Sequence, residues 1–91
     1  MYDLTGFQRD LIYTISGLEE PYGLAIKEAL QTYREEDINH GRLYPNLDTL
    51  VEKGYVEKSA KDRRTNLYTL TEAAMSAVDD RRSWEDGQLA E

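Results

Sequence analysis

The spacing of apolar residues changes twice along the chain, and few folds accommodate both changes. Apolar side chains recur at helical intervals over residues 5–53 and alternate with polar ones over 55–58 and 66–70. Helical spacing then returns after Thr71. The 91 residues suffice for one compact domain and are too few for two. We therefore expect one α+β domain, mainly α, with the order helix, helix, helix, strand, strand, helix.

Start and stop signals support the first three helices. Residues 5–8, Thr-Gly-Phe-Gln, have the form of a capping box, and Gly17 is expected to end the helix that begins there. Pro21 is expected to open the second helix as an early-turn proline. The third helix is expected over about residues 41–53, with Pro45 either making its first turn irregular or delaying its start. The predicted inward-facing residues are Phe7, Leu11, Ile12, Ile15 and Leu18, then Tyr22, Ile26, Leu30 and Tyr33, then Leu43, Leu47, Leu50 and Val51.

The rest of the chain completes a recognisable order. The acidic run at residues 35–37 is predicted to be a loop, and the polar run at 60–65 is predicted to join two strands into a hairpin. Thr71 caps a last helix that reaches about residue 84, followed by a frayed polar tail. This is the order of a winged helix-turn-helix, whose third helix enters the major groove while the hairpin lies on the neighbouring backbone. We expect this DNA-binding domain over residues 1–70, and a C-terminal helix and tail over 71–91.

The charge is unevenly distributed. The net charge is −7, which as a whole opposes contact with nucleic acid. Residues 39–70, however, carry six basic and four acidic side chains, whereas acidic side chains dominate on either side. A local phosphate-facing patch on an acidic body is therefore expected. The excess of acid, with only four lysines, is typical of salt-loving archaea, although an ordinary solubility charge would look the same.

Polar side chains on the third helix and the hairpin suit a duplex. At about 100° per residue, Arg42, Asn46, Thr49 and Lys53 form one stripe beside the buried leucines. Arginine pairs with guanine, asparagine with adenine, threonine contacts the thymine methyl and lysine holds phosphate. An ordinary polar helix face would give the same stripe. The hairpin adds a cluster that would cross phosphates, namely Lys58, Lys61, Arg63, Arg64, Thr65 and Asn66.

Two carboxylates stand against this reading. Asp48 and Glu52 lie on the outward side of the same predicted helix. Asp48 could accept a hydrogen bond from cytosine, lower non-specific binding, or spoil the surface for DNA. The sequence leaves these three roles open.

The segment Gly41-Arg42-Leu43-Tyr44-Pro45-Asn46-Leu47, followed by Leu50 and Gly54, resembles the recognition helix of PadR-type regulators. Residues 21–26, Pro-Tyr-Gly-Leu-Ala-Ile, resemble the start of that family's second helix, and residues 68–71 the end of its wing. The resemblance covers about residues 5–75 and adds Tyr44 to the expected DNA-binding residues. Family members often have basic residues at the positions of Asp48 and Thr49, and a glycine at that of Ala74.

The resemblance also implies partners. It implies a homodimer built by the last helix with help from the first, and release from DNA by a small molecule or other signal. The expected dimer residues are Phe7, Leu11, Ala74, Ala77, Val78, Arg81 and Trp84. Trp84 either stacks on an effector between the subunits or is a packing residue, and packing is the commoner role.

Other function classes have little support. The chain lacks cysteine, and His40 is its one histidine, so we expect neither a transition-metal site nor a disulfide. Catalysis and a cofactor are not expected, because no nucleophile–base pair or glycine-rich phosphate loop is evident. Without a secretory signal or a long apolar run, the chain is expected in the cytoplasm. The principal expectation is a sequence-specific repressor that binds a pseudo-palindrome in double-stranded DNA. A winged helix that binds protein instead of DNA is the alternative, and an enzyme or ligand carrier is a weaker one.

Overall fold

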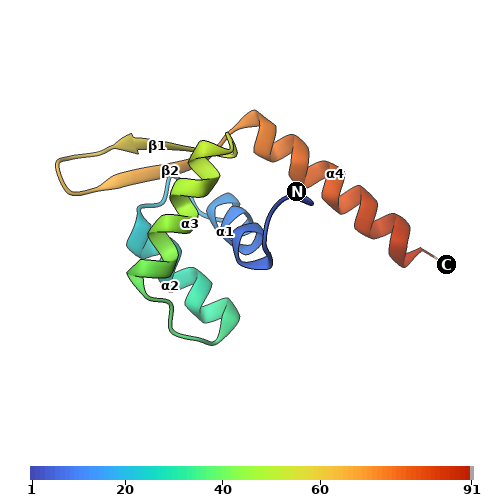
Figure 1. Cartoon of the computed structure of the whole chain (residues 1–91), viewed down its shortest axis with the longest axis horizontal. Helices are drawn as coiled ribbons and strands as arrows, with labels where there is room; N and C mark the ends of the chain where they lie inside the picture. The colour runs from blue at the N-terminus through green and yellow to red at the C-terminus, as the bar shows by residue number, and fades with distance from the viewer. Residues whose placement is uncertain (91) are drawn as a thin grey trace.

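A computed structural model describes residues 1–90, and it contains four helices and one two-stranded antiparallel sheet among them (Figure 1). The expected order of elements is confirmed. The elements are α1 (Gly6–Ser16), α2 (Gly23–Arg34), α3 (His40–Glu52), β1 (Val56–Ala60), β2 (Asn66–Leu70) and α4 (Glu72–Leu89).

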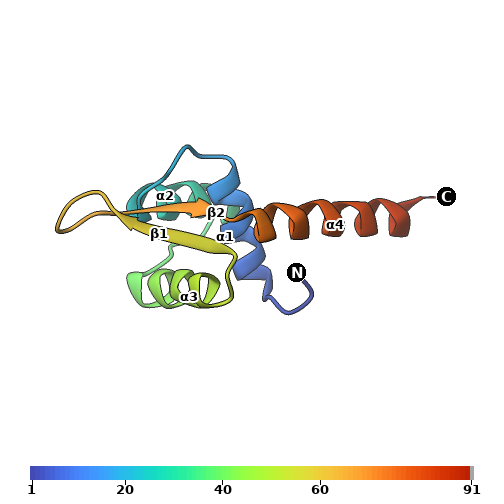
Figure 2. The ribbon, with the colours of Figure 1, turned by 90° about the horizontal axis from the view of Figure 1, so that it is seen from above.

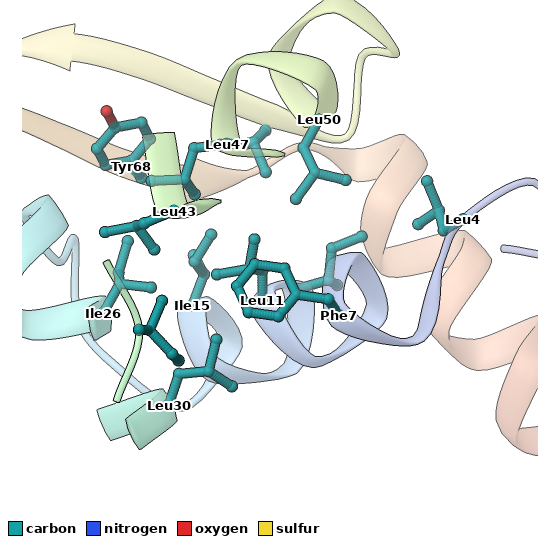
Figure 3. Close-up of a cluster of buried hydrophobic side chains, with 13 residues drawn as sticks. Leu4, Phe7, Leu11, Ile15, Ile26, Leu30, Leu43, Leu47, Leu50 and Tyr68 are labelled. Carbon is teal, nitrogen blue, oxygen red and sulfur yellow. The ribbon is translucent and has the colours of Figure 1, made fainter. Parts of the chain in front are cut away.

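The first three helices enclose one core. α1 lies between α2 and α3 when the molecule is seen from above, and the hairpin covers one end of the group (Figure 2). Apolar side chains from all three helices meet a tyrosine and a valine of the hairpin in this core (Figure 3). The buried residues include Leu11, Ile12, Ile15, Ile26, Leu30, Leu43, Leu47, Leu50, Val56 and Tyr68. Such burial stabilises the domain by about 25 cal/mol for each Å² of apolar surface removed from water.

The start of α1 is confirmed, whereas that of α2 differs from the prediction. Thr5 and Gln8 form the expected capping box before α1, and Gly17 caps its carboxyl end. Pro21 does not open α2; Tyr22 is the N-cap, and the Pro21 carbonyl accepts the N–H of Tyr68 at 2.9 Å. Pro21 therefore joins the loop to the sheet. The predicted buried stripe of α2 is also too long, because Tyr22 and Tyr33 are exposed.

α3 begins one residue earlier than predicted and contains Pro45. The Asn39 side chain caps it by accepting the N–H of Arg42 at 2.8 Å, which makes His40 its first residue. Pro45 has no N–H, so the helical bond to the Gly41 carbonyl is missing. The cost is small because the gap lies near the helix start and on an exposed side.

The hairpin, which we call the wing, projects from the body on the side away from α4 (Figure 1). Val56 pairs with Leu70 and Ala60 with Asn66, so β1 extends two residues beyond the predicted strand. At the turn, the Asp62 carboxylate accepts the N–H groups of Arg64 and Thr65, each at 2.9 Å. The Arg64 N–H is the main reason that the pKa of Asp62 lies below its usual range. The turn is thus held in shape by its own acid.

α4 is longer and more exposed to solvent than predicted. It extends to Leu89, beyond the expected end near residue 84, with an Arg81–Glu85 ion pair at 3.5 Å bridging the last predicted turn. Only Ala74 is buried, and the helix carries the carboxyl terminus away from the body (Figure 2). Its outer part therefore has little apolar contact with the rest of the described chain.

Replacing one core leucine should test the packing of α3. For Leu47→Ala we expect the free energy of unfolding to fall by about 2–5 kcal/mol, because a buried leucine leaves a cavity among three helices. Urea denaturation followed by circular dichroism measures this. Leu89→Ala is the control, because its side chain is 82% exposed and its effect should stay within about 0.5 kcal/mol. Equal losses for the two variants would contradict the packing.

The wing turn should respond to acid through Asp62. Because the pKa of Asp62 is lowered on folding, its contribution is present above the ordinary aspartate pKa and is lost as pH falls through the lowered value. We expect the amide shifts of Arg64 and Thr65, followed by NMR, to titrate in that range. Asp62→Asn keeps an acceptor and should remove the titration. An unchanged titration in this variant would assign it to another group.

Candidate nucleic-acid interface

The turn of the wing carries the unpaired basic side chains predicted to meet phosphate. Lys61, Arg63 and Arg64 are exposed, and none of them forms an ion pair within residues 1–90. Thr65 lies half-buried beside them, and Asn66 is the first residue of β2. The turn between β1 and β2, which carries them, forms one end of the molecule (Figure 2). Within residues 1–90, three of the four basic residues of the predicted wing cluster are therefore left without a carboxylate partner.

Lys58 differs from the rest of the cluster. Its ammonium lies 3.7 Å from the Asp48 carboxylate of α3, and both side chains are substantially exposed. The pair connects the wing to the third helix. In the protein without DNA, Asp48 therefore neutralises a lysine of the wing. This contact was not among the three roles that the sequence left open for Asp48.

Arg42, at the start of α3, is held against α1. Its guanidinium carbon lies 4.0 Å from the centre of the Phe7 ring, and Nη1 lies 3.1 Å from Glu36. Arg34 also pairs with Glu36, at 2.8 Å, and is the main cause of the lowered pKa of Glu36, with Arg42 adding to it. Glu36 belongs to the acidic run predicted to be a loop, so that loop holds an arginine of the predicted DNA-binding stripe.

Asn46 takes part in a hydrogen-bond chain between α1 and α3. Gln8 accepts the Thr5 N–H at 3.1 Å through Oε1 and donates from Nε2 to Asn46 Oδ1 at 3.0 Å. Asn46 in turn donates from Nδ2 to the Arg42 carbonyl at 2.7 Å. The Thr49 hydroxyl donates to the Pro45 carbonyl at 3.0 Å. Asn46 thus lies half-buried between two helices.

Lys53, at the end of α3, is paired with the N-terminal segment. Its ammonium lies 3.2 Å from the carboxylate of Asp3, which also accepts the Tyr55 hydroxyl at 3.2 Å. The Lys53 contact is the main cause of the lowered pKa of Asp3. Burial, followed by Asp3, raises the pKa of Tyr55.

The predicted stripe of α3 therefore lies on the flank toward α1 and the N-terminus. Helical geometry places Gly41, Pro45, Asp48 and Glu52 on the side opposite the buried leucines, and all four are exposed. The side of α3 that faces solvent thus has two carboxylates and no basic side chain. Asp48 alone has a side chain that is 59% exposed.

A hollow between the wing and the start of α2 brings other predicted residues together. It contains Tyr44, Arg64, Thr65 and Asn66 from the predicted set. It also contains four residues outside the predicted DNA-binding set, namely Tyr22, Gly23, Leu24 and Tyr68. The family-like segments at residues 21–26 and 68–71 were the signals available for this group.

The predicted dimer residues divide by burial. Phe7, Leu11 and Ala74 are buried within this chain, whereas Ala77, Val78 and Arg81 are half-buried. Trp84 is 55% exposed, and the Arg81 guanidinium lies 4.8 Å from its ring centre. A groove of about 700 Å³ runs beside this part of α4 and is lined by residues that include Tyr13, Leu18 and Tyr33.

Within residues 1–90, no three His, Cys, Asp or Glu side chains are grouped so that they could hold a metal ion. In the same part of the chain, every helix is too short or too polar to cross a lipid bilayer.

Comparison with solved structures finds close relatives. The chain is 49% identical to hsRosR in the complex structure hsRosR-S1, with a TM-score of 0.93, covering 99% of this chain and 80% of that one. It is 50% identical to RosR of H. salinarum grown from NaBr, with a TM-score of 0.91, covering 98% and 81%. F93 from STIV, a winged-helix DNA-binding protein, is 13% identical with a TM-score of 0.74 over 97% of both chains, which supports the fold.

The acidic composition accords with this likeness to a protein of a haloarchaeon. No curated protein matches the chain. The model of the transcriptional regulator PadR-like family matches residues 11–80. The description of that family is of transcriptional regulators. The chain therefore belongs to the PadR-like family and is a DNA-binding, winged-helix transcriptional regulator.

Proposed function

We propose that the protein represses transcription as a homodimer that recognises a pseudo-palindromic sequence in double-stranded DNA. The observation that carries this proposal is the wing turn, where Lys61, Arg63 and Arg64 are exposed and unpaired within residues 1–90. In a winged helix this turn meets the backbone beside the groove that the third helix enters. The free positive charge is therefore where phosphates would lie.

The α3 side chains supply base contacts in this proposal. When DNA binds, Arg42 leaves Glu36 and Lys53 leaves Asp3 to contact the duplex. Both ion pairs lie near the surface, where water and salt weaken them, so they can be given up. Asn46 keeps one lone pair and one N–H beyond its two hydrogen bonds, so it can still read an adenine. Thr49 completes the set as a contact for a thymine methyl.

The proposed dimer is formed through α4. An 18-residue helix with one buried residue is not stabilised by its own core, and an exposed tryptophan on it favours a second copy as the partner. Ala77, Val78, Arg81 and Trp84 form the contact, since Phe7, Leu11 and Ala74 are already buried. Two α3 helices would then enter major grooves about 34 Å apart.

The groove beside α4 is the place for an effector in this scheme. Its tyrosines suit a flat molecule, and Trp84 lies on α4, which forms one side of the groove. The competing assignment of Trp84 to packing between subunits needs no effector. A small molecule that weakens DNA binding of the wild type but not of Tyr13→Ala would support an effector site in the groove.

A second candidate function is favoured by the outer face of α3. Asp48 and Glu52 repel a phosphate backbone, and such an acidic face would suit a basic protein partner. A winged helix of this kind would show no complex with DNA at any salt. Reversing the charge of Arg63 and Arg64 would leave its function intact.

The wing should set the salt dependence of binding. For a double variant, Arg63→Gln with Arg64→Gln, we expect weaker binding to every duplex and a log–log salt slope reduced by about one for each lost phosphate contact. Footprinting on the DNA upstream of the protein's own gene would first identify the duplex to use. Fluorescence anisotropy with this footprinted duplex and with a random duplex then measures the affinity and the salt slope. Arg42→Ala should instead cost about 1–3 kcal/mol on the footprinted duplex alone.

Arg82→Gln is the matched control, because Arg82 is an exposed arginine on α4. It removes one positive charge, half of what the double wing variant removes, without touching the wing or α3. A loss of binding free energy half as large as that of the double variant would mean that overall charge, and not the wing, determines affinity. If Arg42→Ala leaves the difference in affinity between the footprinted and the random duplex unchanged, Arg42 makes no base-specific contact.

The dimer should depend on the exposed side of α4. Trp84→Glu should raise the dimer dissociation constant at least about tenfold, because it replaces an aromatic contact with a charge. Sedimentation equilibrium measures this constant. Ser83→Glu is the control, because the substitution adds the same charge at a residue that is exposed on a different side of the same helix. A monomeric wild type, or an equal effect of the two substitutions, would contradict the interface.

A further inference from the structure

The glutamine of the α1 capping box makes a second contact that capping does not require. Gln8 is 8% exposed and lies on the side of α1 that meets α3. Its Oε1 accepts the Thr5 N–H at 3.1 Å, which completes the capping box. Its Nε2 donates to Asn46 Oδ1 at 3.0 Å. A side chain predicted only to start a helix therefore also contacts a residue of the predicted DNA-binding stripe.

Glutamate would serve the cap equally well, since the cap needs only a side-chain oxygen at this position. A carboxylate would also suit the positive end of the helix dipole better than a neutral amide does. What glutamine has and glutamate lacks is an N–H group, and in this structure that group is bonded to Asn46. The amide of Gln8 is thus explained by α3 and not by the helix that it begins.

The hydrogen bonds form a chain whose direction is fixed at both ends. The Thr5 N–H can only donate, so it binds the oxygen of the Gln8 amide and turns Nε2 toward α3. Nε2 can only donate, so it requires Oδ1 of Asn46. At the other end the Arg42 carbonyl can only accept, and it binds Asn46 Nδ2 at 2.7 Å. Two backbone groups whose polarity cannot change therefore set the orientation of both amides.

Turning the Asn46 amide over would break both of its hydrogen bonds. Nδ2 would then face Nε2 of Gln8, and Oδ1 would face the Arg42 carbonyl, so that two donors and two acceptors would be opposed. Asn46 is half-buried and Gln8 is buried, and polar groups left unpaired in such surroundings are costly. The Asn46 amide therefore has one preferred orientation before DNA binds.

We propose that Gln8 is a positioning residue for base recognition, and that it determines which base Asn46 reads by fixing the orientation of the Asn46 amide. Adenine offers an acceptor, N7, and a donor, N6, in the major groove, whereas guanine offers two acceptors, N7 and O6. The fixed amide, with one free lone pair and one free N–H, matches adenine and opposes an oxygen to guanine O6. An amide that turns freely can donate to guanine instead. The inference rests on the proposed function, in which α3 reads bases.

Asn46→Ala locates the base pair concerned. Each base pair of the footprinted duplex is replaced in turn, and the affinity for each duplex is measured by fluorescence anisotropy. At one position in each half-site the wild type should prefer adenine over guanine about tenfold, which is the size expected of one bidentate contact. Asn46→Ala should lose the preference at that position and keep the preferences elsewhere.

Two substitutions of Gln8 share the loss of the donor to Asn46 and differ in their other effects. Gln8→Glu keeps an oxygen that caps α1 but adds a charge, whereas Gln8→Met adds no charge but loses the cap. Both should abolish most of the preference for adenine at the Asn46 position and leave the other positions unchanged. Urea denaturation followed by circular dichroism checks that each variant is folded.

Gln31→Glu is the matched control. Gln31 lies on α2, and its Oε1 accepts the Ile38 N–H at 2.9 Å, so this substitution also keeps a backbone contact and adds the same charge. It takes no part in the chain that ends at Asn46. It should therefore weaken binding to every duplex alike and leave the preference for adenine as it is in the wild type.

A failed inference and a failed proposed function give different results. If Asn46→Ala loses the preference at one position and either Gln8 variant keeps it, the inference is overturned and the proposed function stands. An equal loss at every position in both Gln8 variants would make Gln8 a structural residue only, and would overturn the inference too. If Asn46→Ala changes no preference, Asn46 reads no base and Gln8 positions nothing. A wild type without preference at any position does not recognise a sequence, and then the proposed function fails as well.

Discussion

Burial of one leucine stripe on α3 determines how the other faces of that helix are used. Leu43, Leu47 and Leu50 all point into the core, so rotation of the helix about its axis would expose apolar surface. The flank beside this stripe then faces α1 and the N-terminal segment, and the opposite side faces solvent. Every polar contact described for α3 follows from that orientation.

The same orientation brings α3, α2 and the wing to one edge. Tyr44 can lie on the start of α2 only because the leucines hold α3 at this angle and Gly23 leaves the space. The Tyr68 ring completes the core from β2, while its hydroxyl reaches the surface between the three elements. One side chain is thus both a core residue and part of the candidate site.

Local signals in the sequence predicted the elements, because capping and periodicity are properties of neighbouring residues. Thr5 and Gln8 predicted the start of α1, and the leucine spacing predicted the buried side of α3. Gln8 also bonds Asn46, and Arg42 is held by Phe7 and Glu36, contacts that join residues far apart in the chain. Such contacts depend on how the helices pack, so the sequence could predict which polar residues share a stripe on α3 but not which groups surround them.

Pairing, rather than net charge, decides where this acidic protein can meet an anion. Of the six basic residues in residues 39–70, Arg42, Lys53 and Lys58 each have a carboxylate partner, at 3.1, 3.2 and 3.7 Å. Exposed pairs of this kind contribute little net stability, so they reduce the local field more than they stabilise the fold. The charge left unpaired is that of the wing turn, whose shape Asp62 maintains. An acid within the basic cluster thereby orders the cations instead of cancelling them, because its oxygens are bound by backbone N–H groups.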